Sequence, residues 1–517
     1  MPHPRDHAQA TPDKPVIIMA DSGEVVTYRQ LEERANQLAH LFRQLGLQAG
    51  DHIGMMMENN RRFFEIIWAA QRAGIIFTPI STHLIESEVN YILNNCGAKA
   101  FLFTARFSTT AATLREKGSS VETFLLLGDE ALADAPLANA TLADFDLLET
   151  LVADMPITPI DDEEQGGVMF YSSGTTGVPK GVFNPPGSKN IYEHSASVLS
   201  IGETFKFGPH TRYLSPAPLY HAAPLVYNFV NMVFGGTSII MKRFDAENAL
   251  RTIEEFRPNY SQWVPIMFIR MLKLPAAIRN QYDVSSMKLA LHAAAPCPIE
   301  IKEQMIDWWG PVIFEYYGAS EGHGLTAITS EEWLLHKGSV GRAFLGTIHI
   351  LDENGDELPA GEIGDVYFSG GGQFTYFGEE EKTKQAYSKT GYNTVGDIGW
   401  VDEEGYLYLT DRKNFTIISG GVNIYPQEIE NCIINHPQVA DVAVFGIPHP
   451  EFGQEVKAVV QPLNWAEQSP LLANDILEHC HDNLAHIKVP RSLDFMQELP
   501  RKDNGKLYKR RLVEQYS

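Results

Sequence analysis

The stretch Tyr171-Ser-Ser-Gly-Thr-Thr-Gly-Val-Pro-Lys-Gly-Val182 decides the fold of this chain. Glycines let the backbone turn tightly and point N–H groups at an anion, while hydroxyls and a lysine add further donors. The stretch therefore predicts a phosphate-binding loop, although its composition fits a solvated loop equally well. It differs from the Gly-x4-Gly-Lys-Ser/Thr loop, because its lysine follows the second glycine by three residues. The residues concerned are Ser172, Ser173, Gly174, Thr175, Thr176, Gly177 and Lys180.

On the N-terminal side of this loop, strand-like and helix-like segments alternate. Pro15–Ala20, His52–Met57 and Ile75–Pro79 are short apolar runs that predict strands. Thr27 begins a helix with its apolar residues on one face, and Arg61–Ala73 predicts a second helix. This alternation predicts a parallel α/β sheet, and it continues irregularly to about residue 345.

On the C-terminal side the pattern changes twice. Thr347–Leu351 and Asp365–Phe368 are separated by turn residues, which predicts antiparallel strands. After Arg412 a new βα alternation begins, and 517 residues are too many for one core. We therefore expect two domains, 1–411 and 412–517. The elements expected in the second domain are a helix at Glu428–Asn435, strands at Val439–Phe445 and Glu455–Val460, and a helix at Leu471–Leu484.

Composition and charge exclude several classes of protein. The net charge of −24 argues against a nucleic-acid partner, because such a partner needs a face rich in lysine and arginine. No apolar run approaches the ~20 residues that a transmembrane helix needs, and the polar N-terminus is not a signal peptide. The four cysteines form no CxxC pair, which is typical of reduced thiols. We expect a soluble, cytoplasmic protein, for which a homodimer is one possible assembly.

The complete 171–182 string resembles the phosphate-loop signature of the adenylate-forming (AMP-binding) superfamily, and further motifs follow in family order from Thr27 to Lys506. The resemblance is to its acyl-CoA synthetase or fatty-acid–CoA ligase branch. It implies a large N-terminal domain of α/β sheets plus a β-rich subdomain, with a small mobile α+β C-terminal domain. It also implies three ligands besides the acid: ATP, Mg²⁺ and coenzyme A.

Two further motifs resemble the family's nucleotide site. Glu315-Tyr-Tyr-Gly-Ala-Ser-Glu321 resembles its Tyr-Gly-x-Thr-Glu motif, with Ser320 keeping the hydroxyl. The resemblance places Tyr317 and Gly318 against adenine and gives Glu321 to Mg²⁺, roles that suit an aromatic face and a hard carboxylate. Read alone, the motif is a surface turn that ends in a solvated acid.

Residues 391–397 resemble the motif whose aspartate, here Asp397, accepts both ribose hydroxyls, although Val395 replaces the usual threonine. Read alone, Gly-Asp is usually a turn.

The segment from Asp411 to Pro426 resembles the family's hinge. The resemblance gives Arg412 to the ribose and the pivot to Lys413 and Asn414, where the family usually has Asp or Lys at the second position. It places Ser419, Gly420 and Gly421 beside the pantetheine arm of coenzyme A, and Asn423 at the nucleotide. Near the C-terminus, Gly505-Lys506 resembles the motif of the adenylation lysine, on a basic stretch that otherwise fits a solvated tail.

A third group of residues predicts the acyl pocket. His221 resembles the aromatic or histidine wall near the carboxylate. Ala293 and Ala294 belong to a stretch that resembles the family's segment of small residues bordering both adenine and the acyl group, so the resemblance also gives Ala294 to the nucleotide. The candidate walls are apolar or aromatic, which predicts a hydrophobic acid: medium- or long-chain fatty, aryl or steroid-type. The predicted pocket residues are His221, Phe229, Trp263, Val264, Ala293, Ala294 and His323.

These motifs predict an ATP-dependent acid–thiol ligase, in which Lys506, Glu321 and Lys180 are the catalytic residues. The acid would first become an acyl-adenylate and then pass to coenzyme A. One alternative is an enzyme of the same superfamily that loads a carrier protein; the eleven residues after Lys506 favour free coenzyme A instead. Another is a non-catalytic nucleotide sensor, against which the retained Lys180, Asp397 and Arg412 argue.

Overall fold

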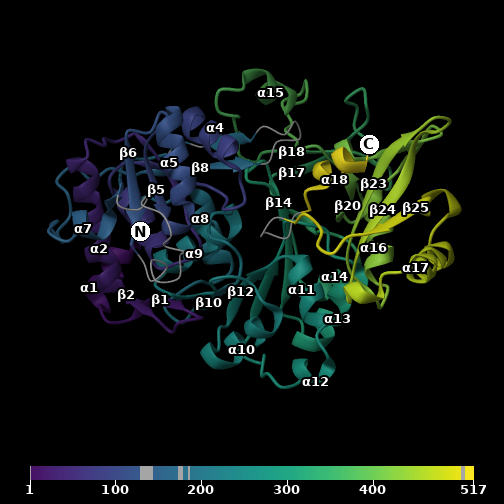
Figure 1. Cartoon of the computed structure of the whole chain (residues 1–517), viewed down its shortest axis with the longest axis horizontal. Coiled ribbons are helices and arrows are strands. Elements are labelled where there is room, and N and C mark those ends of the chain that lie inside the picture. The colour runs from purple at the N-terminus through teal and green to yellow at the C-terminus, as the bar shows by residue number, and fades with distance from the viewer. Residues whose placement is uncertain are drawn as a thin grey trace. The chain divides into compact units, whose positions relative to one another are not determined.

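The computed structural model describes residues 2–128, 144–172, 179–183, 185, 187–501 and 507–516. The chain forms two compact units (Figure 1). Unit 1 comprises Met1–Gln262, Ser286–Lys288 and Phe374–Thr383, and unit 2 comprises Trp263–Ser285, Leu289–Gln373 and Lys384–Ser517.

Within the described residues, unit 1 holds a seven-stranded sheet in the order β7-β6-β5-β3-β4-β8-β9. Strand β3 is parallel to both β4 and β5, with His52 opposite Ile76 and Ala98, whereas β9 is antiparallel to β8. The parallel α/β sheet expected from the sequence is therefore confirmed. The strands are β3 (His52–Met56), β4 (Ile76–Pro79), β5 (Ala98–Thr104), β6 (Thr123–Leu127), β7 (Asp146–Leu147), β8 (Gly167–Ser172) and β9 (Lys180–Phe183).

A second group of strands, most of them in unit 1, is also largely parallel. Strand β11 pairs in parallel with β1 and β10, β10 pairs in parallel with β12, and β2 returns antiparallel to β1. The strands are β1 (Pro15–Met19), β2 (Val25–Thr27), β10 (Arg212–Ser215), β11 (Thr237–Ile240) and β12 (Tyr260–Trp263).

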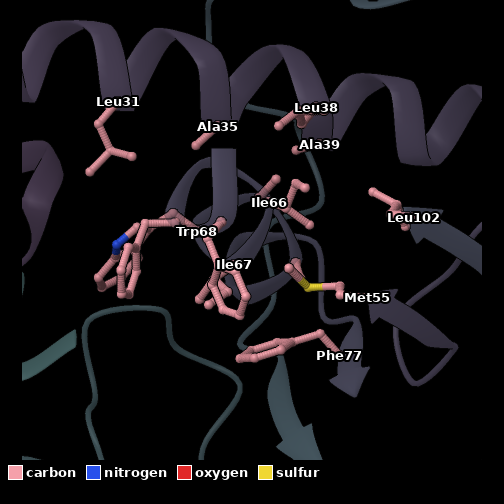
Figure 2. Close-up of a cluster of buried hydrophobic side chains, with 14 of the residues drawn as sticks. Leu31, Ala35, Leu38, Ala39, Met55, Ile66, Ile67, Trp68, Phe77 and Leu102 are labelled. Atoms are coloured by element: carbon pink, nitrogen blue, oxygen red, sulfur yellow. The ribbon is translucent and has the colours of Figure 1, made fainter. Parts of the chain in front are cut away.

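The core of unit 1 forms around α2 (Tyr28–Gln44) and α3 (Arg62–Arg72). Helix α2 begins at Thr27 because the Thr27 hydroxyl accepts the N–H of Gln30, whose side chain accepts the N–H of Thr27 in return. Its apolar face packs over α3 and the strands below (Figure 2). Among the described residues before 260, the other α-helices are α1 (Pro4–Ala10), α4 (Glu86–Cys96), α5 (Ser108–Lys117), α7 (Leu148–Val152), α8 (Ala196–Thr204), α9 (Ala222–Val233) and α10 (Ala246–Phe256).

Unit 2 begins with a mixed sheet that carries several of the predicted site residues. Strand β14 (Ile313–Gly318) is parallel to β13 (Leu289–His292) and antiparallel to β15 (Leu325–Ile328), which pairs with β16 (Arg342–Leu345). The helices of this region are α11 (Pro265–Leu272), α12 (Ala276–Arg279), α13 (Ile299–Trp309) and α14 (Ser330–Leu335). Helix α15 (Glu380–Gln385) begins in the segment of unit 1 that ends at Thr383.

An antiparallel sheet follows, in the order β17-β18-β19-β20. Strand β17 (Thr347–Leu351) pairs with β18 (Gly364–Ser369), which confirms the antiparallel strands predicted there. Strand β19 (Asp397–Val401) then pairs with β20 (Leu407–Arg412). Val340, Val366 and Phe368 contribute to the core of this region.

The C-terminal part of unit 2 is a sheet in the order β22-β21-β24-β23, with β25 parallel to β24. The predicted helices and strands are confirmed, although β23 and β24 extend further because they pair from Val439–Pro462 to His449–Gly453, with a shift in register between Val439 and Asp441. The described residues include no helix long and apolar enough to cross a membrane. The elements are β21 (Ile417–Ser419), β22 (Val422–Ile424), α16 (Pro426–Ile434), β23 (Val439–His449), β24 (Gly453–Pro462), α17 (Pro470–Asn483), β25 (Ser492–Phe495) and α18 (Lys509–Tyr516).

Candidate active site

A pocket in unit 2 brings together several predicted site residues that lie far apart in sequence. One side carries polar groups, and another is an apolar wall at the start of α11. Such a combination suits a ligand that is polar at one end and apolar at the other. Its lining includes Val264, Pro265, Ile266, Ile269, Ala294, Glu315, Tyr317, Gly318, Asp397, Asp411, Arg412, Gln427, Glu430, Asn431, Ile434, Asp441, Arg501, Leu507 and Lys509.

Tyr317, Asp397 and Arg412 form the polar centre of this pocket. The antiparallel register places Asp397 at the start of β19 opposite Arg412 at the end of β20. The Tyr317 hydroxyl donates to Asp397 Oδ2 at 2.6 Å, and Arg412 Nε lies 3.1 Å from Asp397 Oδ1. Burial, followed by the charge of Asp397, raises the pKa of Tyr317 well above its usual value, so the phenol stays neutral and donates.

Glu315 lines the same pocket, although its motif predicted no role for it. Its carboxylate lies 2.6 Å from the ammonium of Lys302, which is 0% exposed on α13. Burial raises the pKa of Glu315, and the charge of Lys302 opposes that rise. The available sequence signal for this pair was a lysine among the apolar positions of the α13 segment, because a buried lysine needs an anionic partner.

Ala294 lines the pocket with a left-handed backbone, at φ 75°. Its neighbour Ala293 is buried. Few non-glycine residues adopt such a φ, and the strain is often found at binding sites. The expected segment of small residues therefore lies at the pocket, where Ala294 and Ala295 are in the lining.

Glu321 and His323 follow β14 and are both buried. The His323 ring lies 4.9 Å from the ring of Phe368 and 6.1 Å from that of Tyr317. Within the described residues, neither His323 nitrogen has a hydrogen-bond partner, and burial lowers the pKa of His323 to about 4. His323 is therefore neutral at physiological pH. Ser320, by contrast, is exposed.

In unit 1, Lys180 begins β9, and its ammonium lies 4.5 Å from the centre of the Tyr376 ring. A bridge between Val182 and Tyr376 holds the two segments together. Ser172 ends β8. The predicted loop residues Ser173, Gly174, Thr175, Thr176 and Gly177 lie outside the described residues.

The predicted hinge and coenzyme A residues follow β20. Lys413 and Asn414 form a short 3-10 turn, in which the Lys413 ammonium lies 2.6 Å from Asp365 Oδ2. Gly420 and Gly421 form the turn between β21 and β22 at φ 57° and 81°. The left-handed backbone of the turn therefore favours glycine at both positions, whatever passes beside it. Ser419 is buried and Asn423 exposed, and neither is among the pocket-lining residues given above.

The predicted adenylation residue Lys506 lies outside the described residues. Its flanks, Arg501 before it and Lys509 after it, line the pocket. Arg501 is ion-paired with Asp441, and its Nη2 donates to Asp441 Oδ1 at 2.6 Å. Lys509 Nζ lies 2.8 Å from Glu430 on α16. These ion pairs hold Arg501 and Lys509 in the lining of the pocket that Asp397 and Arg412 also line.

The predicted acyl-pocket residues occupy three kinds of place. Val264 and Ala294 line the pocket of unit 2. Trp263 is 0% exposed and packs against Phe268 and Trp309, so its side chain lies in the core. In unit 1, His221 precedes α9 as its N-cap, and Phe229 stacks on Trp68 at 4.4 Å.

Comparison with known proteins shows which enzyme family this chain belongs to. The family model for AMP-binding enzymes matches residues 4–376, and the model for their C-terminal domain matches residues 428–506. The chain therefore belongs to the AMP-binding enzyme family. Within that family it is an acyl-CoA synthetase, as its relatives are named CoA ligases. Membership implies ATP and coenzyme A as co-substrates.

Two curated relatives match almost the whole chain. One is the long-chain-fatty-acid–CoA ligase FadD13 of Mycobacterium tuberculosis, 31% identical over 519 residues that cover 99% of this chain and 97% of the relative. Another is a feruloyl-CoA synthase from Amycolatopsis, 30% identical and covering 94% and 93%. The crystal structure of ATP-bound MatB from Rhodopseudomonas palustris matches with a TM-score of 0.79 at 27% identity, over 100% of this chain and 99% of that one.

Proposed function

We propose that this acyl-CoA synthetase activates a hydrophobic carboxylic acid, either a medium- or long-chain fatty acid or a bulky aryl or steroid-type acid. In the first half-reaction the carboxylate attacks the α-phosphorus of ATP, which forms an acyl-adenylate and expels pyrophosphate. In the second, the thiol of free coenzyme A attacks the acyl carbon, which forms the thioester and releases AMP.

The observation that carries this proposal is the composition of the pocket in unit 2. Its polar centre, Asp397 and Arg412, shares one cavity with the apolar side chains of Val264, Ile266 and Ile269. A nucleotide at the polar centre would place an attached acyl group against an apolar surface. Each buried methylene contributes about 0.8 kcal/mol, roughly fourfold in binding, so such a wall favours larger apolar acids.

The nucleotide end of the pocket suits adenosine. Asp397 has two oxygens that can accept the two ribose hydroxyls, and Arg412 is ion-paired with one of these oxygens. The ring of Tyr317 offers a flat apolar face to adenine, while its hydroxyl holds Asp397 in place. Gly318 lines the pocket next to Tyr317 without adding a side chain.

Charge stabilisation at the phosphates is assigned to Lys180, to Lys506 and to a Mg²⁺ ion that Glu321 would bind. Negative charge develops on the α-phosphate oxygens as the acid approaches, and fixed cations stabilise that charge in the transition state. Within the described residues, no group of three or more acidic, histidine or cysteine side chains could hold a metal ion. The buried carboxylate of Glu321 fits Mg²⁺, which binds through one or two carboxylates with phosphates and water as its other ligands.

Two successive assays test the proposal and separate it from its alternatives. ATP–pyrophosphate exchange without any thiol should proceed with the acid alone, whereas a nucleotide sensor would show none. Coenzyme A should then give the thioester, whereas a carrier-loading enzyme would need a protein-bound pantetheine.

A panel of acids identifies the substrate class. We expect kcat/KM to rise from acetate through octanoate to dodecanoate or palmitate, or to be highest with ferulate or a steroid side-chain acid. An optimum at acetate or propionate would remove the basis for an apolar acyl site.

A further inference from the structure

The C-terminal end of α16 is held by a lysine from another part of unit 2. Lys273 follows α11 directly, and its ammonium donates to the carbonyl of Ile434, the last residue of α16, at 3.2 Å. The same ammonium donates to the carbonyl of Val439, where β23 begins. One side chain thus binds the end of a helix and the start of the next strand.

A second contact lies beside the first. The side-chain amide of Asn435 donates to Glu300 Oε2 on α13 at 2.9 Å. Helices α11 and α13 pack against each other. Lys273 and Glu300 therefore bind the C-terminal end of α16 from one pair of packed helices.

The chemistry of the Lys273 contact is favourable in this place. The carbonyls at the end of a helix carry partial negative charge, and a cation there is stabilising. Burial lowers the pKa of Lys273 to about 8, with the charge of Asp441 acting in the opposite direction, so the side chain is mainly an ammonium at neutral pH. A charged donor gives stronger hydrogen bonds to carbonyls than a neutral one.

Helix α16 in turn carries groups that reach the pocket. Gln427, Asn431 and Ile434 line it, and Glu430 holds Lys509, three residues after Lys506, at 2.8 Å. The contacts therefore form a chain that runs from Lys273 through α16 and Glu430 to the flank of segment 502–506.

We propose that Lys273 and Glu300 are positioning residues that hold α16, and with it the flanks of Lys506, in the adenylate-forming arrangement. This inference rests on the proposed function, in which Lys506 serves the first half-reaction alone. The lining of the pocket supports the adenylate-forming arrangement. Arg501 and Lys509 line the pocket together with Asp397, whereas the described lining does not include the Gly420–Gly421 turn. Coenzyme A transfer needs no contact from Lys506, so losing these two contacts should impair only adenylation.

Lys273→Met tests the inference, because methionine has a similar length but donates no hydrogen bond. ATP–pyrophosphate exchange with dodecanoate, or with the fastest acid of the panel, should fall about tenfold, as expected when a charged donor to two carbonyls is lost. Thioester formation from the supplied acyl-AMP and coenzyme A should stay within about twofold of the wild type. Lys273→Arg, which keeps a cationic donor, should recover most of the exchange rate.

Glu300→Ala should give a smaller fall of the same kind, about threefold, and it serves as the test if Lys273→Met does not fold. The matched control is Lys288→Met, since Lys288 is exposed. An equal fall in both half-reactions, or an unchanged exchange rate in a folded variant, would overturn the positioning role. A wild-type enzyme that catalyses neither half-reaction with any acid of the panel would instead overturn the proposed function.

Discussion

Ala294 illustrates how one residue can combine backbone strain with a place in the pocket. Its φ of 75° is a left-handed conformation that costs a non-glycine residue about 1–2 kcal/mol, partly offset by the greater chain entropy that glycine loses. We therefore expect Ala294→Gly to raise the free energy of unfolding by about 0.5–1 kcal/mol, as measured by denaturant titration. Ala295→Gly is the matched control, because Ala295 also lines the pocket but has no positive φ, and it should be destabilising. Equal effects of the two substitutions would argue against strain at Ala294.

His323 makes the stability of the protein depend on pH. Its pKa is lowered by burial from 6.5 to about 4, so the unfolded chain binds this proton more tightly than the folded chain does. The stabilising effect of a neutral His323 is present above pH 6.5 and is lost as the pH falls towards 4, by about 2 kcal/mol at pH 5. His323→Phe should remove that part of the loss, which denaturant midpoints at pH 7.5 and 5 would measure. An unchanged difference between the two midpoints would contradict this account.

At the scale of elements, α13 is tied to β14 by one buried ion pair. Removing the ammonium alone would leave Glu315 buried and unpaired beneath the pocket, which typically costs about 3–5 kcal/mol. Lys302→Met should therefore be strongly destabilising in equilibrium unfolding. The double variant Lys302→Met with Glu315→Gln should recover more than half of that loss, since the glutamine carries no charge. If the double variant were as unstable as the single one, the loss would come from packing against Trp333 rather than from the unpaired charge.

Elements with local signals were predictable from the sequence, and contacts between distant elements were not. The helix after Thr27 needs only its capping residues and its apolar period, and it begins where the sequence placed it. The Tyr317–Asp397 hydrogen bond joins residues 80 positions apart, so only the resemblance to a family linked them. Trp263 shows a second reason why the site is hard to predict. A sequence does not distinguish an apolar side chain that lines a pocket from one that packs in the core, as Trp263 does.

At the scale of the whole molecule, two half-reactions are assigned to two different segments of one chain. Adenylation is assigned to Lys506, whose flanks line the pocket through Arg501 and Lys509. Thioester formation is assigned to the Gly420–Gly421 turn, which is made of two left-handed glycines. If the assignments hold, the two steps should be separable by substitution, since each segment would serve only one of them.

A reciprocal pair of variants tests this separation. Lys506→Ala removes a cation from the developing phosphate charge, so pyrophosphate exchange should fall about a hundredfold or more while the supplied acyl-AMP still reacts with coenzyme A. Gly421→Asn should do the reverse. Asparagine tolerates a left-handed backbone, so the turn should survive, yet its side chain would obstruct a thiol passing beside it. Both variants are measured in both half-reactions with the same acid. If either variant slowed the two half-reactions equally, its segment would serve a common step or the fold as a whole, and that assignment would be wrong.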